Sequence, residues 1–334
     1  MKIVVDVFGG DNAPEEILNG AEAALLCKED INLVLVGNET VIGRYISEHN
    51  IDKNRVEILH AKDVISNDDV PTEAIRKKND SSLVKCFEYL NNNSDAEGLV
   101  SAGSTGAVLT GAVLLLKRIR GINRPALCPV LPTVNNSQVL LIDCGANVEP
   151  KALNLIQFAL LGSAYAKSVF GVKQPRISLL NNGTEEHKGT SLNKEVYQML
   201  KSNPNFIGNI EAREILSGQT DVVVCDGYSG NIALKGCEGT ALSMFQIIKD
   251  NILAGGLRAK LGYLLLKPVF KKVKVKMDYN DNGGAVLLGL EKIIVKSHGS
   301  SKAKAIKNSI IQIYDMVNNN LVENIKSEIA NGVN

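Results

Sequence analysis

The sequence predicts an α/β fold built on a mainly parallel β-sheet. Short apolar runs that suit buried strands alternate along the chain with longer stretches that suit helices. The connections between them are short, and parallel strands need helical crossovers that cover both faces of their sheet. A chain of 334 residues can bury a large core. We therefore expect two lobes, or one large domain, in which helices sandwich the sheet.

The first elements show this alternation. Residues 2–7 form an apolar strand, and a loop that contains Gly10 and Asp11 follows it. Pro14 and two glutamates then begin a helix that extends to about Cys27, because proline and acidic residues favour a helical first turn. Further strands are expected at 31–36, 56–59, 127–131, 139–143, 176–180 and 221–225, and further helices at 39–49, 71–78, 82–91, 153–170 and 192–201.

Two glycine-rich corners occur between a strand and a helix. In the first, residues 99–117 contain the end of a buried strand, a tight loop from Gly103 to Gly106 and an apolar helix. Glycine lets the backbone turn sharply, and Ser104 and Thr105 add hydroxyl groups at a helix N-terminus, where a phosphate can bind. Residues 224–234 repeat the pattern. A turn whose Ser and Thr only cap the helix is the alternative, but the repetition favours a cleft with two anion-binding walls.

Composition and charge exclude several classes of function. Lys and Arg number 37 against 36 Asp and Glu, and Trp is absent, so neither a basic surface nor stacking platforms for nucleic acid are expected. The sequence contains no run of 18 apolar residues, so no membrane span is predicted. The acidic residue at position 6 favours a strand over a signal peptide. The six cysteines form no C-x-x-C pair, which indicates reduced core thiols of a cytosolic protein.

Several cofactor motifs are incomplete. The first strand is not followed by G-x-G-x-x-G, which disfavours a nicotinamide cofactor. Residues 183–190 resemble a P-loop, but the lysine and glycine near its end are in reversed order. The four histidines lack metal-ligand spacing, and no G-x-S-x-G elbow is present. We therefore expect neither a cofactor nor a metal ion.

Short motifs occur in a fixed order along the whole chain. The motifs are Asp6-x-x-Gly9-Gly10-Asp11-x-x-Pro14, Ser101-Ala-Gly-x-Thr-Gly106, Gly121-Ile-x-Arg-Pro125, Asp143-x-Gly-Ala-Asn147, Glu185-x-x-Lys188-Gly189, Asn205-Phe-Ile-Gly-Asn209, Cys225-Asp-Gly-x-x-Gly-Asn231, Gly283-Gly-Ala285 and His298-Gly-Ser-Ser301. Together they resemble the phosphate acyltransferase family of bacterial phospholipid synthesis. Ser104 stands where the family usually has Asn, and Tyr228 and Ser229 replace a Phe-Val type pair.

The resemblance implies a fold and an activity. The family shares the three-layer α/β/α sandwich of phosphotransacetylases and isocitrate dehydrogenases, with a large mixed sheet, two lobes and usually a dimer. Here one catalytic unit, 1–334, would divide into a lobe of 1–122 with 279–334 and a lobe of 123–278. The implied reaction transfers a long-chain acyl group from acyl carrier protein to inorganic phosphate. A short-chain phosphotransacetylase that uses coenzyme A and a non-enzymatic membrane-surface scaffold are the alternatives.

The reaction needs an oriented phosphate and donors for the developing oxyanion. Phosphate is already an anion near neutral pH, so direct displacement needs orientation more than a strong base. We expect Lys188 and Asn231 to be catalytic, the lysine as a point charge and the asparagine at the oxyanion. A solvated lysine and a simple helix-start donor are the structural alternatives. The expected phosphate- and substrate-binding residues are Gly10, Asp11, Ser101, Gly103, Ser104, Thr105, Gly106, Glu185, Asp226, Gly227 and Gly230.

Other groups near these loops have alternative explanations. Asp11 and Asp226 could cap helices or orient the cationic side chain. Cys144 and Cys225 could carry an acyl group, but neither is paired with an identifiable base, so buried thiols are expected.

Residues 241–276 combine apolar helical stripes with a cluster of lysines. Leu253, Leu257 and Leu261 lie at or beside a glycine-containing tip, and Lys267, Lys271, Lys272, Lys274 and Lys276 follow. Apolar residues beside lysines suit an interfacial helix on anionic lipid, so we expect membrane contact at the three leucines and a cytoplasmic, peripherally membrane-associated protein. The alternatives are helices packed on the core or on a second subunit, and an edge strand guarded by lysines.

Overall fold

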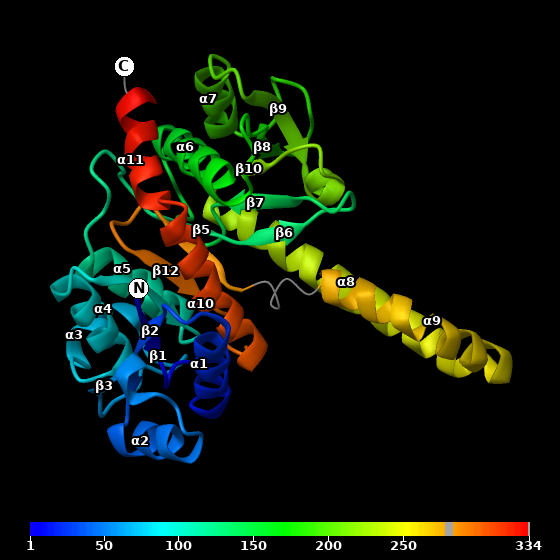
Figure 1. Ribbon diagram of the computed structural model, residues 1–334. Helices are drawn as coiled ribbons and strands as arrows, with labels where there is room; N and C mark the ends of the chain where they lie inside the picture. Colours follow the sequence, from blue (N-terminus) through cyan, green and yellow to red (C-terminus); the bar gives the residue numbers. More distant parts are fainter. Residues whose placement is uncertain (278–282, 333–334) are drawn as a thin grey trace.

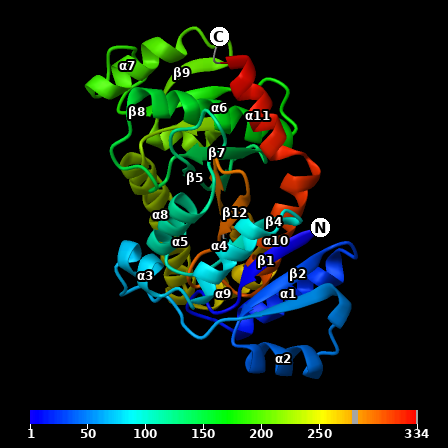
Figure 2. The ribbon, with the colours of Figure 1, turned by 90° about the vertical axis from the view of Figure 1, so that its left-hand side faces the viewer.

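The computed structural model describes residues 1–277 and 283–332, and the chain has the expected α/β fold. Its described strands form two mixed, mainly parallel sheets. In Figures 1 and 2 the strands numbered from β1 to β4 lie in the lower half of the molecule, and those from β7 to β10 lie in the upper half. The α/β class and the mainly parallel pairing predicted from the sequence are therefore confirmed, with the strands divided between two sheets.

The larger sheet has seven strands. In sheet order they are β3 (Val56–His60), β2 (Asn32–Gly37), β1 (Lys2–Asp6), β4 (Ala96–Ser101), β12 (Ile293–Lys296), β11 (Ala285–Leu288) and β5 (Ala126–Cys128). In this sheet β11 runs antiparallel to both of its neighbours, and the other described pairs are parallel. Alternate residues of β1 enter different apolar clusters, Ile3 with one and Val4 with the other, so both faces of the sheet are covered.

Helices cover the two faces of this sheet. One face packs on α1 (Glu15–Cys27) and α10 (Ala303–Asn318). The other face packs on α4 (Ser82–Asn92) and α5 (Thr105–Leu115), with α3 (Pro71–Lys77) against α5. At the outer edge, α2 (Glu39–Glu48) and the short 3₁₀ helix η1 (Lys53–Arg55) link β2 to β3. This arrangement is the three-layer sandwich that the sequence predicts.

The smaller sheet has five strands. In order they are β6 (Val130–Pro132), β7 (Gln138–Ile142), β10 (Val222–Val224), β8 (Ile177–Asn181) and β9 (Phe206–Glu211). One face packs on α6 (Ala152–Val169) and α7 (Ser191–Leu200), and the other on the 3₁₀ helix η2 (Ala212–Ser217) and the first turns of α8 (Gly227–Ala254). The expected lobe boundaries stay a prediction.

The strand expected over 127–131 is wrong as a single element. It breaks at Pro129 into β5, which joins the larger sheet, and β6, which joins the smaller one. Proline has no N–H to donate to a strand ladder, so the chain can leave one sheet there and enter the other. The carbonyl of Pro129 still accepts from Leu141 N at 3.1 Å, which holds the crossing point against β7.

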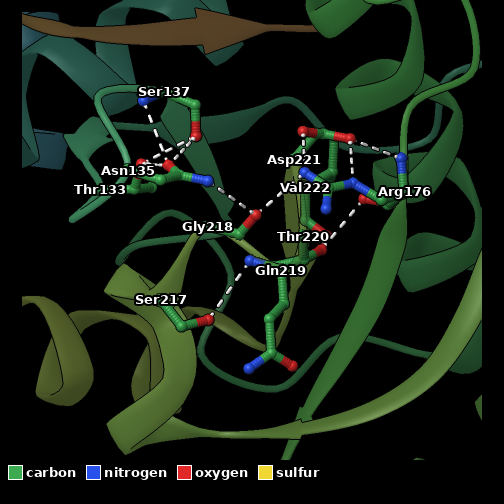
Figure 3. Close-up of polar contacts among 10 residues, drawn as sticks. All are labelled: Thr133, Asn135, Ser137, Arg176, Ser217, Gly218, Gln219, Thr220, Asp221 and Val222. Carbon is green, nitrogen blue, oxygen red and sulfur yellow. Dashed lines mark hydrogen bonds and ion pairs between the residues drawn. The ribbon is translucent and has the colours of Figure 1, made fainter.

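A polar network fastens the N-terminal edge of the smaller sheet. Figure 3 shows Arg176, which precedes β8, joined to the buried Asp221, which precedes β10, by side-chain bonds of 2.8 and 3.0 Å. Arg176 also donates to Gly218 O at 3.1 Å, and Asn135 before β7 approaches the same carbonyl at 3.5 Å. Because this network occupies the N-terminal edge, the loops free to build a site lie at the opposite edge, beyond the strand C-termini.

The C-terminal helices and a long hairpin complete the fold. In Figure 1, α10 lies along α1, and α11 (Leu321–Gly332) continues toward α6. The hairpin of α8 and α9 (Gly256–Met277) projects away from the body in the same view. Helix α9 includes the lysine-rich stretch, so the alternative of an edge strand there is wrong.

Candidate functional site

Three adjacent parallel strands end together at the C-terminal edge of the larger sheet. They are β1, β4 and β12, and their last residues are Asp6, Ser101 and Lys296. Ser101 Oγ donates to Asp6 Oδ2 at 2.7 Å and accepts from Gly103 N at 3.1 Å. Burial raises the pKa of Asp6, whereas hydrogen bonds and the charge of Lys296 oppose that rise. The buried Asp6–Ser101 pair therefore sets the path of the first glycine corner.

The first corner leaves backbone N–H groups at the start of α5. Among the described residues no side chain caps this helix, although Ser104 occupies the cap position. The first helical bond is donated by Val108 N to Ser104 O at 2.9 Å. The N–H groups of Thr105 and its next two neighbours therefore precede the helical ladder, in the geometry that suits an anion. A side chain at Gly9 would come within 2.3 Å of Asp6 Oδ2, so the neighbouring loop can approach only because this residue is glycine.

The second corner satisfies its own polar groups. Asp226 caps α8 by accepting from Ser229 N at 2.8 Å, and Gly227 N donates to Asn147 O at 2.7 Å. A Cβ at Gly230 would lie 1.9 Å from the carbonyl oxygen of Asp143. The geometry thus gives Asp226, Gly227 and Gly230 roles in capping and close packing.

The buried carboxylate of Asp143 supports the second corner from below. It accepts from Leu127 N at 2.9 Å, Ala146 N at 3.2 Å and both nitrogens of Asn147 at 2.6 and 2.9 Å. Burial raises the pKa of Asp143, and these hydrogen bonds oppose the rise. The carboxylate thus ties the loop after β7 to β5 of the other sheet.

The two corners contribute to one cavity of about 620 Å³ between the sheets. Thr105 comes from the first corner, and Asn231 from the first turns of α8. The other polar side chains that line it include Gln138, Lys235, Glu238, Lys296, Ser297, His298, Asn308, Gln312 and Asp315. Apolar residues from β5, β6, α6, α8 and α10 line it too, namely Leu127, Pro129, Val130, Tyr165, Val169, Phe170, Leu234 and Ile311. Such a cavity can hold an anionic group and an aliphatic chain at once.

A smaller cavity of about 230 Å³ lies on the other side of the first corner. Gly10, Asp11, Gly103 and Ser104 line it, together with Phe8 and residues 64–67. Asp11 N donates to Gly299 O at 2.8 Å, which joins the loop after β1 to the segment after β12. Ser101 is buried, and a Cβ at Gly106 would meet Pro71 of α3 at 2.7 Å.

Lys188 and Glu185 lie in the loop between β8 and α7. Lys188 N donates to Glu185 O at 3.1 Å, and Asn181 Nδ2 donates to Lys188 O at 3.2 Å. Strand β8 is the neighbour of β10, so this loop and the second corner extend from the same edge of the smaller sheet. The described lining of the two cavities includes neither Lys188 nor Glu185. The structure thus brings Thr105 and Asn231 together and places the lysine on a neighbouring loop.

Lys296 is the candidate residue that sequence reasoning missed. It ends β12, is 7% exposed and lines the large cavity. Burial lowers its pKa to about 8, although Asp6 and Asp11 favour the charged form. The signal was a lysine at the end of the apolar run Ile293–Val295, directly before a motif with histidine and glycine.

The thiols are mostly buried. Cys86, Cys128, Cys144 and Cys225 lie inside the fold, whereas Cys237 is half-buried and Cys27 is exposed, so the expectation of six core thiols is wrong for Cys27. Burial raises the pKa of Cys144 and Cys225 well above the ordinary value of a thiol. In the described part of the chain, no three His, Cys, Asp or Glu side chains gather as a metal ion would require.

The hairpin exposes the leucines of the expected membrane segment. Leu253, Leu257 and Leu261 are 56%, 88% and 61% exposed, and Lys267 and Lys271 of α9 are also exposed. Phe245 and Ile252 are half-buried. The side chains of Lys274 and Lys276 lie outside the described residues. Of the helices described, none has the length and apolar character needed to cross a membrane.

Comparisons with known proteins agree over nearly the whole chain. A family model described as "Fatty acid synthesis protein" matches residues 1–324. A phosphate acyltransferase of Clostridium tetani is 46% identical over 332 residues, which cover 99% of this chain and 98% of the relative. One of Pediococcus pentosaceus is 45% identical over 329 residues, or 97% and 93% of the two chains. A solved phosphotransacetylase from Streptococcus pyogenes matches with a TM-score of 0.59 over 97% of this chain and 94% of that one, at 19% identity, which concerns the fold alone.

Proposed function

Since this chain belongs to the phosphate acyltransferase family, whose members transfer acyl groups to phosphate, we propose that its acyl donor is a long-chain thioester of acyl carrier protein. The product would be an acyl phosphate for phospholipid synthesis. The observation that carries this proposal is the mixed lining of the large cavity. Its polar side chains suit phosphate and a thioester carbonyl, and its eight apolar side chains offer a surface for an aliphatic chain.

In the proposed mechanism, phosphate attacks the thioester directly. The N-terminus of α5 and the hydroxyl groups of Ser104 and Thr105 hold the phosphate beside the carbonyl carbon. An oxygen of phosphate bonds to that carbon, the C–S bond breaks, and the thiolate leaves with its electron pair. Orientation of this kind contributes up to ~7–11 kcal/mol to lowering the barrier. The thiol has a reference pKa near ~8.5, so its departure needs little acid assistance.

Asn231 and Lys188 complete the proposed machinery. The amide of Asn231 lies at the cavity and can donate to the developing oxyanion, an interaction worth ~3 kcal/mol in comparable sites. Lys188 adds a positive charge from the β8–α7 loop. Glu185 would orient that loop, and Asp11 would orient the loop after β1. Gly10 and Gly103 would allow the backbone to approach the substrate, and Ser101 would hold the turn at Gly103 in place.

An acyl-enzyme route through cysteine is disfavoured. A thiolate is the nucleophilic form, and burial raises the pKa of both Cys144 and Cys225. Cys144→Ala and Cys225→Ala are therefore expected to keep full activity. A trapped thioester on either residue would overturn direct displacement.

The main test measures whether the release of thiol from the acyl donor depends on phosphate. Purified protein is incubated with palmitoyl acyl carrier protein, with and without inorganic phosphate, and free thiol and acyl phosphate are quantified. We expect stoichiometric release of both only when phosphate is present. Equal release of thiol with and without phosphate would refute the proposed reaction.

A short-chain phosphotransacetylase that uses coenzyme A is the second candidate, because solved phosphotransacetylases share the fold. The same assay with acetyl coenzyme A separates the two. Faster turnover of acetyl coenzyme A than of the long-chain carrier-protein thioester would establish this alternative.

We also propose that the hairpin docks on the membrane surface, where an amphiphilic acyl phosphate would go next. Three exposed leucines near its tip and exposed lysines on α9 match an interfacial element on anionic lipid. A homodimer in which the hairpins pack together and expose only their tips is compatible with this arrangement. The protein would then be cytoplasmic and peripherally membrane-associated.

Vesicle co-sedimentation tests the docking. Leu253→Glu with Leu257→Glu should release the protein from anionic vesicles and spare activity on soluble acyl carrier protein. Unchanged vesicle binding would contradict the proposal. A dimer lost in sedimentation velocity would instead assign these leucines to the subunit interface.

A further inference from the structure

Lys296 is a buried cation to which the mechanism above gives no role. Only 7% of it is exposed, yet it lines the large cavity with Thr105 and Asn231. Ordering and desolvating a lysine ammonium is costly, so such groups are buried where an opposite charge or a function compensates. The question is which group compensates this charge.

The partners of the ammonium inside the protein are neutral. Lys296 Nζ donates to the backbone carbonyl of Ser297 and lies 3.5 Å from the carbonyl oxygen of Ala102. Among the described residues no carboxylate lies within ion-pair distance, although Asp6 and Asp11 act on it from further away. By contrast, Lys235 in the same cavity pairs with Glu238 at 2.8 Å. The charge of Lys296 is therefore still available to an anion in the cavity.

The ammonium of Lys296 also lies next to the first corner. Ala102, whose carbonyl it approaches, comes directly before the loop that leads to the uncapped start of α5 at Thr105. The lysine and the free N–H groups of α5 thus belong to one neighbourhood, and Thr105 and Lys296 line the same cavity. A tetrahedral oxyanion can accept from an ammonium and from several N–H groups together.

We propose that Lys296 is a further catalytic residue, whose ammonium binds inorganic phosphate against the N-terminus of α5. This inference rests on the proposed acyl transfer to phosphate. The bound dianion supplies the opposite charge that the buried ammonium lacks, and it therefore keeps the lysine protonated. The lysine in turn orients the attacking oxygen and draws phosphate into a desolvated site.

Matched lysine variants of the full chain test the charge. In Lys296→Met, we expect the KM for phosphate and the Kd for inorganic phosphate from calorimetry to rise about 10- to 100-fold, as for loss of a hydrogen bond to a charged group. The matched control is Lys292→Met, four residues earlier, whose ammonium also donates to backbone carbonyls, those of Ser94 and Ala96, but lies outside the described cavity linings. The control should keep the wild-type affinity. Unchanged phosphate affinity in Lys296→Met would refute the proposal.

A proton-uptake measurement on the wild-type protein does not depend on that variant folding. Burial lowers the pKa of Lys296 to about 8, and a bound dianion raises it again. At pH 8 the free lysine is only partly protonated, so phosphate binding should take up a fraction of a proton per site, seen by calorimetry in buffers of different ionisation enthalpy. The affinity should fall as the pH rises above about 8. The other titratable groups that act on Lys296 or line its cavity are Asp6, Asp11, Lys235, Glu238, His298 and Asp315.

The variant Lys296→Arg tests whether the proton taken up on phosphate binding goes to Lys296. Arginine stays protonated throughout this range, so the variant should bind phosphate without proton uptake. Uptake that persists in Lys296→Arg belongs to another group, such as His298, and would overturn the proposal. Both binding experiments use phosphate alone. A failure of the acyl-transfer assay can therefore be told apart from a failure of the role given to Lys296.

Discussion

The two glycine corners share a sequence pattern but differ in how their hydrogen bonds are used. At the β10–α8 corner, Asp226 caps the helix, and Gly230 packs directly on the carbonyl of Asp143. At the β4–α5 corner no described side chain caps the helix, and a Cβ at Gly106, the counterpart of Gly230, would meet Pro71 at 2.7 Å. Both corners are closely packed, but the second caps its own helix, and the first leaves N–H donors that a ligand can use.

The difference shows that a glycine pattern alone does not assign an anion site. Glycine permits close approach of either a ligand or another part of the chain, and the sequence pattern is the same in both cases. What distinguishes the corners is the residue before the helix. An aspartate reaches back to cap α8, whereas Ser104 does not cap α5.

The largest expected effect is on folding at the second corner. Gly230→Ala would place a methyl group 1.9 Å from a backbone oxygen, so we expect a loss of ~3 kcal/mol or more in the free energy of unfolding. The control is Gly236→Ala in the same helix, where nothing lies within 4 Å, and which should gain ~0.5–1 kcal/mol. Urea unfolding measures both, and equal stability of the two variants would contradict the close-packing role.

The next effect concerns the loop beside the second corner. Lys188→Ala should lower turnover by ~10²-fold or more, as for loss of a group that stabilises the transition state, and leave the fold intact. Lys194→Ala, an exposed lysine on α7, should behave as wild type. Near-normal activity of Lys188→Ala at low phosphate would show that Lys188 is not catalytic. The catalytic groups would then be those of the first corner and Asn231.

Asn231→Ala tests whether the second corner contributes a catalytic group at all. An oxyanion donor acts mainly in the transition state, so kcat should fall ~10²-fold with a smaller change in KM. Steady-state kinetics with a carrier-protein thioester measure both constants. A change confined to KM would make Asn231 a binding residue.

The smallest effects compare the two helix starts directly. Asp226→Ala should cost ~1 kcal/mol of stability, because it removes the cap of α8. Ser104→Ala removes no described cap, so thermal unfolding should shift by less than half as much. If Ser104→Ala proves as destabilising as Asp226→Ala, the contrast between the corners is wrong.

The sequence by itself determined the α/β class, most of the elements up to residue 225 and the helical hairpin, whereas β9, β11, β12, α10 and α11 were not predicted from it. Apolar periodicity and helix-start residues act locally, so α1 begins at Glu15, as its proline and acids predict, and most other bounds fall within a residue or two. Both glycine corners could be located in this way, because turns have a local chemistry.

Only the tertiary structure decided how these pieces are used. Pro129 divides one apolar run between two sheets, and no local pattern tells which sheet each half will join. Lys296 is a polar residue at the end of a short apolar run. It pairs with β4 on one side and β11 on the other, and its burial lowers its pKa. Desolvation and hydrogen-bond satisfaction depend on atoms distant in the sequence. Only the folded structure therefore shows that Lys296 is the buried charge and that the N–H groups at the start of α5 are uncapped.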